Sequence, residues 1–314
     1  MERASIAILL ATYNGGRYLR QQLDSILAQT EQGWRLLVSD DGSSDDTLEI
    51  LQEYQRQYPD RIILSQHEVP TGSSRENFMY LTRLAGGYDY VMYCDQDDVW
   101  LPQKVSLTLR EMRRLEGSKP QTPCLVHTDL AVVRADLTLK SESYFYASLL
   151  DAGRNTLNRL VIQNIVTGCT MMMNHALWEK AVQPIRGGDM LMHDWWCALW
   201  AAAVGRIGFV SLPTILYRQH GDNVVGAKDV RSFRYMATWM NRLSQNAQSL
   251  RNTQAQAAAF LATAGDDLTE RQKKLLSDYA AIGGTGKWNR WAVLRRHGIW
   301  LLGARRKIAE MMLI

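Results

Sequence analysis

The sequence predicts an α/β fold with a mostly parallel sheet flanked by helices, because short apolar runs alternate with segments of helical periodicity. Apolar runs at residues 6–11, 34–39, 62–64 and 90–93 have the length and composition of buried strands. Polar turns follow the first two of these runs and lead into segments with apolar residues at every third or fourth position. Strands separated by helices of this length are typical of βαβ units, in which neighbouring strands run parallel.

The rest of the chain continues this pattern and then changes. A helix is predicted from Pro102 to about Glu116, followed by strands at 125–134, 168–173 and 207–218 and a buried helix at 195–204. Helices are also expected at 233–261 and 269–281. Residues 1–229 have a net charge of −5 and residues 230–314 one of +9, so we place a domain boundary near Asp229. An α/β domain over 1–229 and a helical, basic region over 230–314 are expected.

An acidic cluster follows the predicted strand at 90–93. Asp95, Asp97 and Asp98 fall within four positions in the run Cys-Asp-Gln-Asp-Asp-Val-Trp. Carboxylates at the end of a buried strand form an oxygen-rich site that suits a hard divalent cation such as Mg²⁺ or Mn²⁺. Acids just before a helix also favour its dipole, but capping uses fewer than three. The cluster favours a metal site that bridges phosphates.

The first two strand ends also carry polar residues. Thr12, Tyr13 and Asn14 follow the first strand, and Asp40 and Asp41 follow the second. An aromatic ring beside exposed backbone and a carboxylate provides what a pyrimidine base needs. The alternative for the aspartates is an Asp-Gly turn that leads into a helix.

These three stretches together resemble the inverting family 2 glycosyltransferases of GT-A fold, over roughly residues 6–223. Within that family the chain is most similar to bacterial rhamnosyltransferases that build surface polysaccharides such as O-antigen. The likeness is carried further by His193-Asp194-Trp-Trp and by the run Leu-Tyr-Arg218-Gln-His220-Gly-Asp-Asn. The resemblance implies a GT-A fold with a helical C-terminal extension.

The resemblance also implies a role for each matched residue. Asp41, with Asp40, Thr12, Tyr13 and Asn14, would hold the base of the donor. Asp97 would be the main metal ligand, with Asp95 contacting the ribose or the metal shell. His220 would complete the metal site or contact the phosphates. Arg218 would offset charge on the leaving group, Gly168 would let backbone approach the sugar, and Asp194 would be the catalytic base.

Simpler roles compete with three of these assignments. Gly168 would suit a glycine at the entry of a strand. Asp194 suits the N-cap of the predicted helix at 195–204, and His220 suits a loop histidine bonded to backbone. The family motif often has Glu before its catalytic Asp, whereas this chain has His193, whose role stays open.

The C-terminal region suggests a surface for association. Residues 285–314 carry seven Lys or Arg and a single acid, interleaved with Trp288, Trp291 and Trp300. A basic helix bordered by tryptophan suits an anionic membrane surface, and packing on the body or in a homodimer is the alternative. Nucleic-acid binding is disfavoured because no known module is present and the first 229 residues are acidic.

The expected location is cytoplasmic, at the inner face of the membrane. No signal peptide or apolar run long enough to span a bilayer is visible, and the four cysteines have no metal-site or disulfide spacing. The resemblance implies metal-dependent transfer of a sugar, with L-rhamnose from dTDP-β-L-rhamnose favoured, onto a lipid-linked oligosaccharide. Alternatives are a UDP-hexose donor, a non-catalytic scaffold and, less favoured without a lysine-containing phosphate loop, a nucleotidyltransferase.

Overall fold

The computed structural model describes residues 4–67, 69–220 and 243–301. Contacts divide the chain into two compact units. The first unit comprises residues 1–144, 167–182 and 206–226, and the second comprises 145–166, 183–205 and 227–314. The expected boundary near Asp229 lies outside the described residues and stays a prediction.

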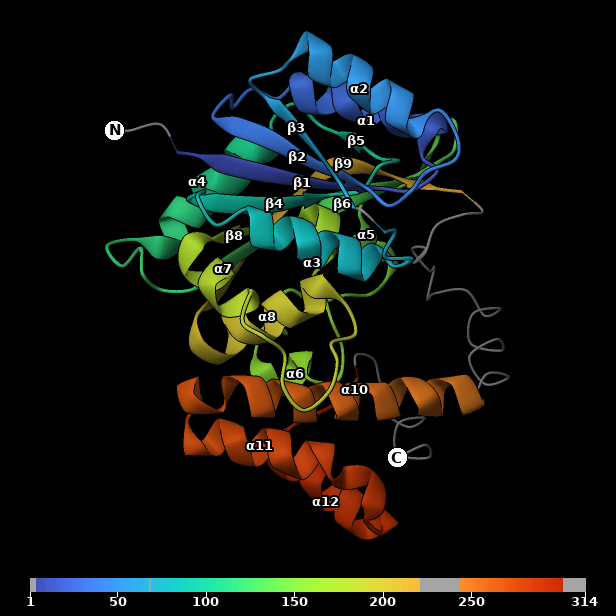
Figure 1. Ribbon diagram of the computed structural model, residues 1–314. Coiled ribbons are helices and arrows are strands. Elements are labelled where there is room, and N and C mark those ends of the chain that lie inside the picture. The colour runs from blue at the N-terminus through green and yellow to red at the C-terminus, as the bar shows by residue number, and fades with distance from the viewer. Residues whose placement is uncertain (1–3, 68, 221–242, 302–314) are drawn as a thin grey trace. The chain divides into compact units, whose positions relative to one another are not determined.

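A single sheet forms the centre of the first unit (Figure 1), and its described part has nine strands. The strands are β1 (Ile6–Thr12), β2 (Trp34–Asp40), β3 (Ile62–Gln66), β4 (Tyr90–Cys94), β5 (Val99–Trp100), β6 (Cys124–Arg134), β7 (Leu139–Ser141), β8 (Met172–Asn174) and β9 (Arg206–Gln219). Their order is β3-β2-β1-β4-β8-β6-β9-β5, and β7 pairs with β6.

The parallel half of this sheet is the predicted βαβ array. β1 pairs in parallel with β2 and β4, and β2 with β3, so the carboxyl ends of these strands meet at one edge. The short strand β8 runs antiparallel between β4 and β6, which makes the whole sheet mixed. In an open sheet of this kind, ligands bind beyond the carboxyl ends of the parallel strands.

Five helices belong to the first unit, within the part of the chain that the structure describes. They are α1 (Gly16–Leu27), α2 (Thr47–Gln57), α3 (Ser74–Leu84), α4 (Lys104–Glu116) and α7 (His175–Ala181). In Figure 1, α1 and α2 lie on one side of the sheet and α3 and α7 on the other. Leu19, Leu23 and Ile26 of α1 are buried, as their helical spacing predicts.

One predicted strand, at 168–173, is only partly correct. The chain forms a short 3₁₀ turn, η1 (Gly168–Thr170), and enters β8 only at Met172. Met172 and Met173 pair with both β4 and β6, so the strand is limited to the few residues that lie between these two strands. Gly168 therefore begins a turn and not a strand.

The second unit is helical in its described residues. It contains α5 (Tyr144–Ala147), α6 (Leu157–Leu160), α8 (His193–Val204), α10 (Leu243–Ala264), α11 (Glu270–Ala280) and α12 (Lys287–His297), with 3₁₀ turns η2 (Gly265–Asp267) and η3 (Ile282–Gly284). Trp196 and Trp200 of α8 pack edge-on against Phe260 of α10, with ring centroids 5.3 and 5.2 Å away. The C-terminal helices thus share a core with a helix from the middle of the chain. No described helix is long and apolar enough to cross a membrane.

Candidate active site

The acidic loop, residues 95–98, connects β4 to β5 at the carboxyl edge of the parallel strands. Residues 91–94 of β4 are buried, and this anchors the loop at its start. Asp95 and Asp97 are partly exposed, whereas Asp98 is completely buried. The sheet therefore places the carboxylates of Asp95 and Asp97 partly at the surface and that of Asp98 in the interior.

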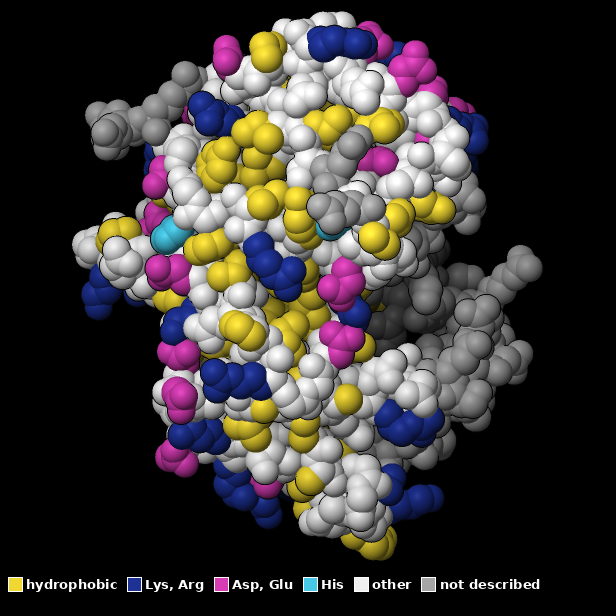
Figure 2. Space-filling view, viewed as in Figure 1, with side chains coloured by type: hydrophobic (Ala, Val, Ile, Leu, Met, Phe, Trp, Pro, Cys, Tyr) yellow, Lys and Arg dark blue, Asp and Glu magenta, His cyan; other side chains and the backbone are white. Residues whose placement is uncertain are grey.

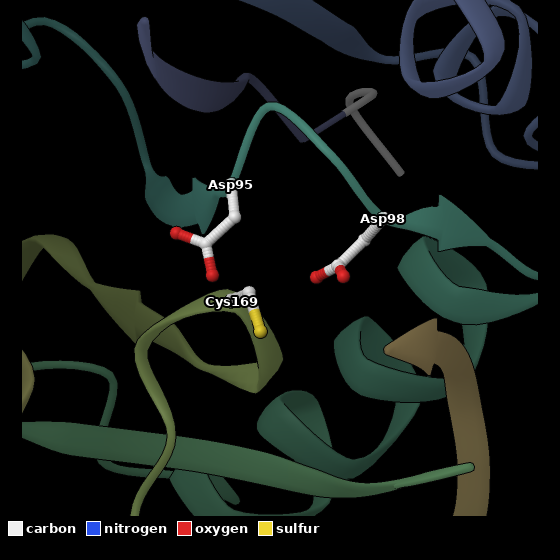
Figure 3. A group of neighbouring side chains, drawn as sticks. All are labelled: Asp95, Asp98 and Cys169. Atoms are coloured by element: carbon white, nitrogen blue, oxygen red, sulfur yellow. The ribbon is translucent and has the colours of Figure 1, made fainter. Parts of the chain in front are cut away.

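Asp95 and Asp98 converge with Cys169 from η1 (Figure 3), and their ligand atoms lie within 4.8 Å of one another. The backbone N–H of Arg218 donates to Asp98 Oδ1 over 2.9 Å, while Oδ2 is buried without a hydrogen-bond partner among the described residues. Burial, followed by the charges of Asp95 and Asp97, raises the pKa of Asp98 well above its usual range. An ionised carboxylate in this position calls for a cation.

The thiol of Cys169 is a weaker candidate for a ligand. Burial raises its pKa well above the ordinary value, and the charges of Asp95 and Asp98 raise it further. A protonated thiol is a poor metal ligand, and Mg²⁺ and Mn²⁺ prefer oxygen. The donor set for a hard ion is therefore the carboxylates.

Asp97 is not part of this group and meets His220. The distance from His220 Nε2 to Asp97 Oδ2 is 2.7 Å, and both side chains are largely buried. Residues 97 and 220 are far apart in the chain, and the end of β9 brings His220 to the acidic loop because Val99 of β5 pairs with Leu216. The structure thus brings together two of the three predicted metal ligands, and imidazole and carboxylate both suit Mn²⁺.

Arg218 is almost completely buried behind the acidic loop. Its Nε donates to the backbone oxygen of Asp97 over 2.7 Å, Nη2 donates to Gln21 Oε1 over 2.6 Å, and Nη1 donates to the backbone oxygen of Ala135. The guanidinium also stacks over Tyr18, 4.4 Å from the ring centroid. Arg218 therefore fixes the loop through neutral acceptors, and its predicted contact with the leaving group stays a prediction.

A second buried cation lies close to the same loop. Lys104, the first residue of α4, is fully buried, and its Nζ lies 4.6 Å above the Trp100 ring. Burial lowers the pKa of Lys104 to about 8, partly offset by the negative charge of neighbours that include Asp98. This lysine is placed at a helix N-terminus, where a cation is disfavoured by the dipole. Its Nζ has no hydrogen-bond partner among the described residues, so the charge of Asp98 offsets only part of the cost of burying it.

The loops after β1 and β2 form the predicted base-binding side. Asp40 accepts hydrogen bonds from Thr12 Oγ1 over 2.9 Å and from the N–H and hydroxyl of Ser43 over 2.9 and 2.6 Å. Asp40 is thus committed to the turn, as its simpler interpretation predicted. Asp41 accepts from the N–H and hydroxyl of Thr71 over 2.5 and 2.9 Å. Tyr13 leaves 59% of its surface exposed beside them.

Asn14 adopts an unusual backbone conformation in the loop after β1. Its φ is +47°, a value that residues other than glycine rarely adopt, although asparagine tolerates it. Its Oδ1 accepts from the N–H of Ser44 over 2.8 Å, and its own N–H donates to Ser43 Oγ over 2.9 Å. These bonds tie the loop after β1 to the loop after β2.

Asp194 lies in the second unit, in the first turn of α8. The helix begins at His193 with Met192 at the N-cap, so the expected N-cap role of Asp194 is wrong. Its Oδ1 accepts the N–H of the adjacent Trp195 over 2.6 Å, which still places a carboxylate at the positive end of the helix. The catalytic role of Asp194 stays a prediction, as does that of Gly168 at the start of η1.

Sequence reasoning missed several side chains that the structure places around the loops; these are Tyr18, Gln21, Thr71, Gln96, Lys104 and Cys169. A partial signal existed for two of them. Tyr18 and Gln21 are three residues apart on a predicted helix and so share a face. Cys169 and Thr71 reach the site only through long-range packing, for which a single sequence holds no signal.

Comparison with known proteins identifies the family of the chain. The family model described as "Glycosyl transferase family 2" matches residues 7–178. The dTDP-rhamnosyl transferase RfbG of Shigella flexneri is 28% identical over 226 residues, covering 69% of this chain and 74% of that protein. The putative glycosyltransferase EpsE of Bacillus subtilis is 32% identical over 100 residues, covering 32% of this chain and 35% of its own length.

Solved structures show the same fold. A crystal structure of S. aureus TarS, residues 1–349, has a TM-score of 0.57 at 15% identity, covering 98% of this chain and 77% of that one. The expected GT-A architecture with C-terminal helices is confirmed. Because the family model matches more than half of its residues, the chain belongs to glycosyl transferase family 2 and is a glycosyltransferase.

Proposed function

We propose that this enzyme transfers L-rhamnose, with inversion, from dTDP-β-L-rhamnose to a lipid-linked glycan of a surface polysaccharide. The observation that carries the proposal is the similarity to RfbG, a dTDP-rhamnosyl transferase, over 69% of this chain and 74% of that protein. Inversion at the anomeric carbon of the β-linked donor gives an α-linked product. Such a displacement needs stabilisation of the leaving group and a positioned base.

A divalent cation, Mg²⁺ or Mn²⁺, fits the acidic loop. The fit rests on the buried Asp98 Oδ2, which has no hydrogen-bond partner among the described residues, and on the charges of Asp95 and Asp97, which oppose ionisation of Asp98. Asp97, Asp95 and His220 would hold the ion, with Asp98 behind them. The bound metal would offset the charge that develops on the diphosphate as it leaves.

The donor nucleotide would extend from the acidic loop to the loops after β1 and β2. Asp41 and the exposed Tyr13 supply a carboxylate and a ring face for a pyrimidine base, with Thr12, Asn14 and Asp40 supporting the loops. S. aureus TarS, which shares the fold, has been crystallised with UDP and with UDP-GlcNAc. A nucleoside diphosphate is therefore the class of ligand that we assign to these loops.

Asp194 would accept the proton of the acceptor hydroxyl. Its position in the first turn of α8 suits a carboxylate, because the positive end of the helix dipole favours negative charge there. General bases typically contribute about 10²–10⁴-fold to rate. Asp194→Asn is therefore expected to lower kcat by that factor and to leave the donor KM nearly unchanged.

The helix α12 would bring the enzyme to the surface that carries its acceptor. Val293 and Leu294 are buried, whereas Trp288 and Trp291 are exposed by 89% and 40%. Figure 2 shows Lys and Arg side chains over α11 and α12, interspersed with hydrophobic ones. A basic surface with exposed tryptophan suits anionic lipid headgroups. These features support our proposal that the enzyme acts at the inner face of the cytoplasmic membrane.

The proposal is tested by thermal stabilisation of the purified protein with dTDP and UDP, each with Mn²⁺ or with EDTA. A ligand that binds only the folded state raises the melting temperature, and at equal concentration the tighter ligand raises it more. We expect metal-dependent stabilisation that is larger with dTDP than with UDP. A larger effect of UDP would replace the rhamnosyl donor by a UDP-hexose, and no effect of either nucleotide would favour a non-catalytic scaffold.

A further inference from the structure

We infer that Gln96 is a positioning residue that couples the base-binding loops to the metal-binding loop. Gln96 lies between Asp95 and Asp97 in the acidic loop, and its side chain is directed to the loop after β1. The inference rests on the proposed function, because it concerns a nucleoside diphosphate that contacts both loops at once.

The amide of Gln96 pairs with the backbone of Tyr13 in both directions. Gln96 Nε2 donates to the backbone oxygen of Tyr13 over 2.9 Å, and the backbone N–H of Tyr13 donates to Gln96 Oε1 over 2.8 Å. This reciprocal pairing is the pattern that two strands use in a sheet, here made by one side chain. It fixes both the spacing and the rotation of residue 13 relative to the acidic loop.

Gly15 is shaped to accept this side chain. A Cβ atom at Gly15 would lie 2.3 Å from Gln96 Oε1 and 2.4 Å from its Cδ. Gly15 is the N-cap of α1, and its φ of −103° is open to any residue, so a larger side chain here would displace the Gln96 amide and would not strain the backbone. The amide of Gln96 therefore occupies the space that a side chain at residue 15 would fill.

The same loop is held on its other side by the loop after β2. Besides the two Asn14 bonds to residues 43 and 44, the N–H of Gly15 donates to Thr47 Oγ1 over 2.8 Å. Residues 13–15 thus bridge the segment with Asp41 to the segment with Asp95 and Asp97. Gln96 supplies both hydrogen bonds between Tyr13 and the acidic loop that the structure gives.

This connection matters for a ligand that contacts both segments. Once the base of the nucleotide is bound, the contact between its diphosphate and the metal becomes intramolecular. The gain in nucleotide affinity from this contact depends on how firmly the distance between the two loops is held. Two hydrogen bonds of ordinary net strength correspond to about a ten-fold change in an equilibrium constant or somewhat more. Without Gln96, each half of the site stays intact but the two halves cooperate less.

The test compares Gln96→Ala, Gly15→Ala and their double variant with the wild-type protein. Titration calorimetry gives the Kd of dTDP with Mn²⁺ and with EDTA, and the ratio of the two values measures the coupling between metal and nucleotide. Electron paramagnetic resonance of free Mn²⁺ gives the affinity for the metal alone. Gln103→Ala, at the exposed N-cap residue of α4, is the matched control.

We expect the coupling ratio to fall about ten-fold in Gln96→Ala and in Gly15→Ala, with unchanged affinity for Mn²⁺ alone. Because both changes remove the same contact, the double variant should lose no more than Gln96→Ala does. An unchanged ratio in Gln96→Ala would overturn the inference. So would an equal loss of Mn²⁺ affinity, since Gln96 would then support only the metal loop. If wild-type protein binds neither dTDP nor UDP, the proposed function itself fails.

Discussion

Replacement of Arg218 by lysine tests whether this residue holds the acidic loop in place. The guanidinium donates to the backbone oxygens of Asp97 and Ala135 and to the Gln21 side chain, and it stacks on Tyr18. Lysine keeps the positive charge, but its single ammonium nitrogen lacks the planar fork that reaches three acceptors lying in different directions. We expect Arg218→Lys to keep one of these hydrogen bonds and to lose two.

The size of the effect follows from burial. Arg218 is 1% exposed, so the acceptors that lose their donor stay away from water. A hydrogen bond from a charged donor contributes about 1.5–3 kcal/mol, and the loss of two gives about 3–6 kcal/mol before the site relaxes. After relaxation, a decrease of about 2–5 kcal/mol in the free energy of unfolding is expected. The affinity for Mn²⁺ should fall as well, because the guanidinium anchors the backbone of Asp97.

Urea unfolding in EDTA measures the stability, and Arg206→Lys serves as the control. Arg206 lies on the same strand, is exposed, and donates from Nη1 to the backbone oxygen of Leu115 over 2.9 Å. Because water replaces this bond, the control should change the free energy of unfolding by less than about 0.5 kcal/mol. If Arg218→Lys is as stable as the control and binds Mn²⁺ as tightly as wild type, Arg218 does not hold the loop.

Three further predictions concern other parts of the chain. Burial lowers the pKa of His127 to about 3, so the unfolded state binds more protons between about pH 6.5 and 3, and this residue costs about 2 kcal/mol of stability at pH 5. His127→Leu does not have this cost, so its free energy of unfolding should fall less than that of wild type as the pH is lowered, and the difference between the two proteins should narrow. A difference that stays constant with pH would contradict the pKa assigned to His127. Because ionised Asp98 is disfavoured by its surroundings, Asp98→Asn should raise the melting temperature in EDTA at pH 7.5 and reduce the stabilisation by Mn²⁺; a lower melting temperature in EDTA would refute this. The double change Trp288→Ala and Trp291→Ala should weaken binding to anionic vesicles roughly ten-fold or more, whereas Tyr58→Ala on the first unit should not, as sedimentation can show.

Much of the sheet could be predicted from local pattern. β1, β2 and β4 are short apolar runs that end in polar residues, and their boundaries differ from the predicted ones by about one residue. The 3₁₀ turn at Gly168 was missed because a run of apolar residues does not distinguish a strand from a buried turn followed by a strand. The packing of Phe260 against α8 was also beyond prediction, since no local periodicity links residues 60 positions apart.

The site shows the same division. The separation of Asp97 and His220 in the sequence holds no information about their distance in space. Only the family resemblance, which gives both as metal ligands, indicated that they lie close together. The resemblance did not show that the guanidinium of Arg218 would be engaged by neutral acceptors, or that Lys104 would be buried beside the loop. Both facts depend on the paths of β9 and α4 in three dimensions.

The central claim, rhamnosyl transfer, is tested most directly by donor turnover. Purified enzyme with Mn²⁺ or Mg²⁺ and membranes of the producing cells as acceptor source would be given dTDP-β-L-rhamnose, UDP-glucose or UDP-galactose, and the released nucleoside diphosphate would be measured. We expect release of dTDP from dTDP-rhamnose to exceed release of UDP, to stop with EDTA and in Asp97→Asn, and to yield an α-rhamnosyl product by NMR. Faster release of UDP from a UDP-hexose, or release that persists in Asp97→Asn, would contradict the account.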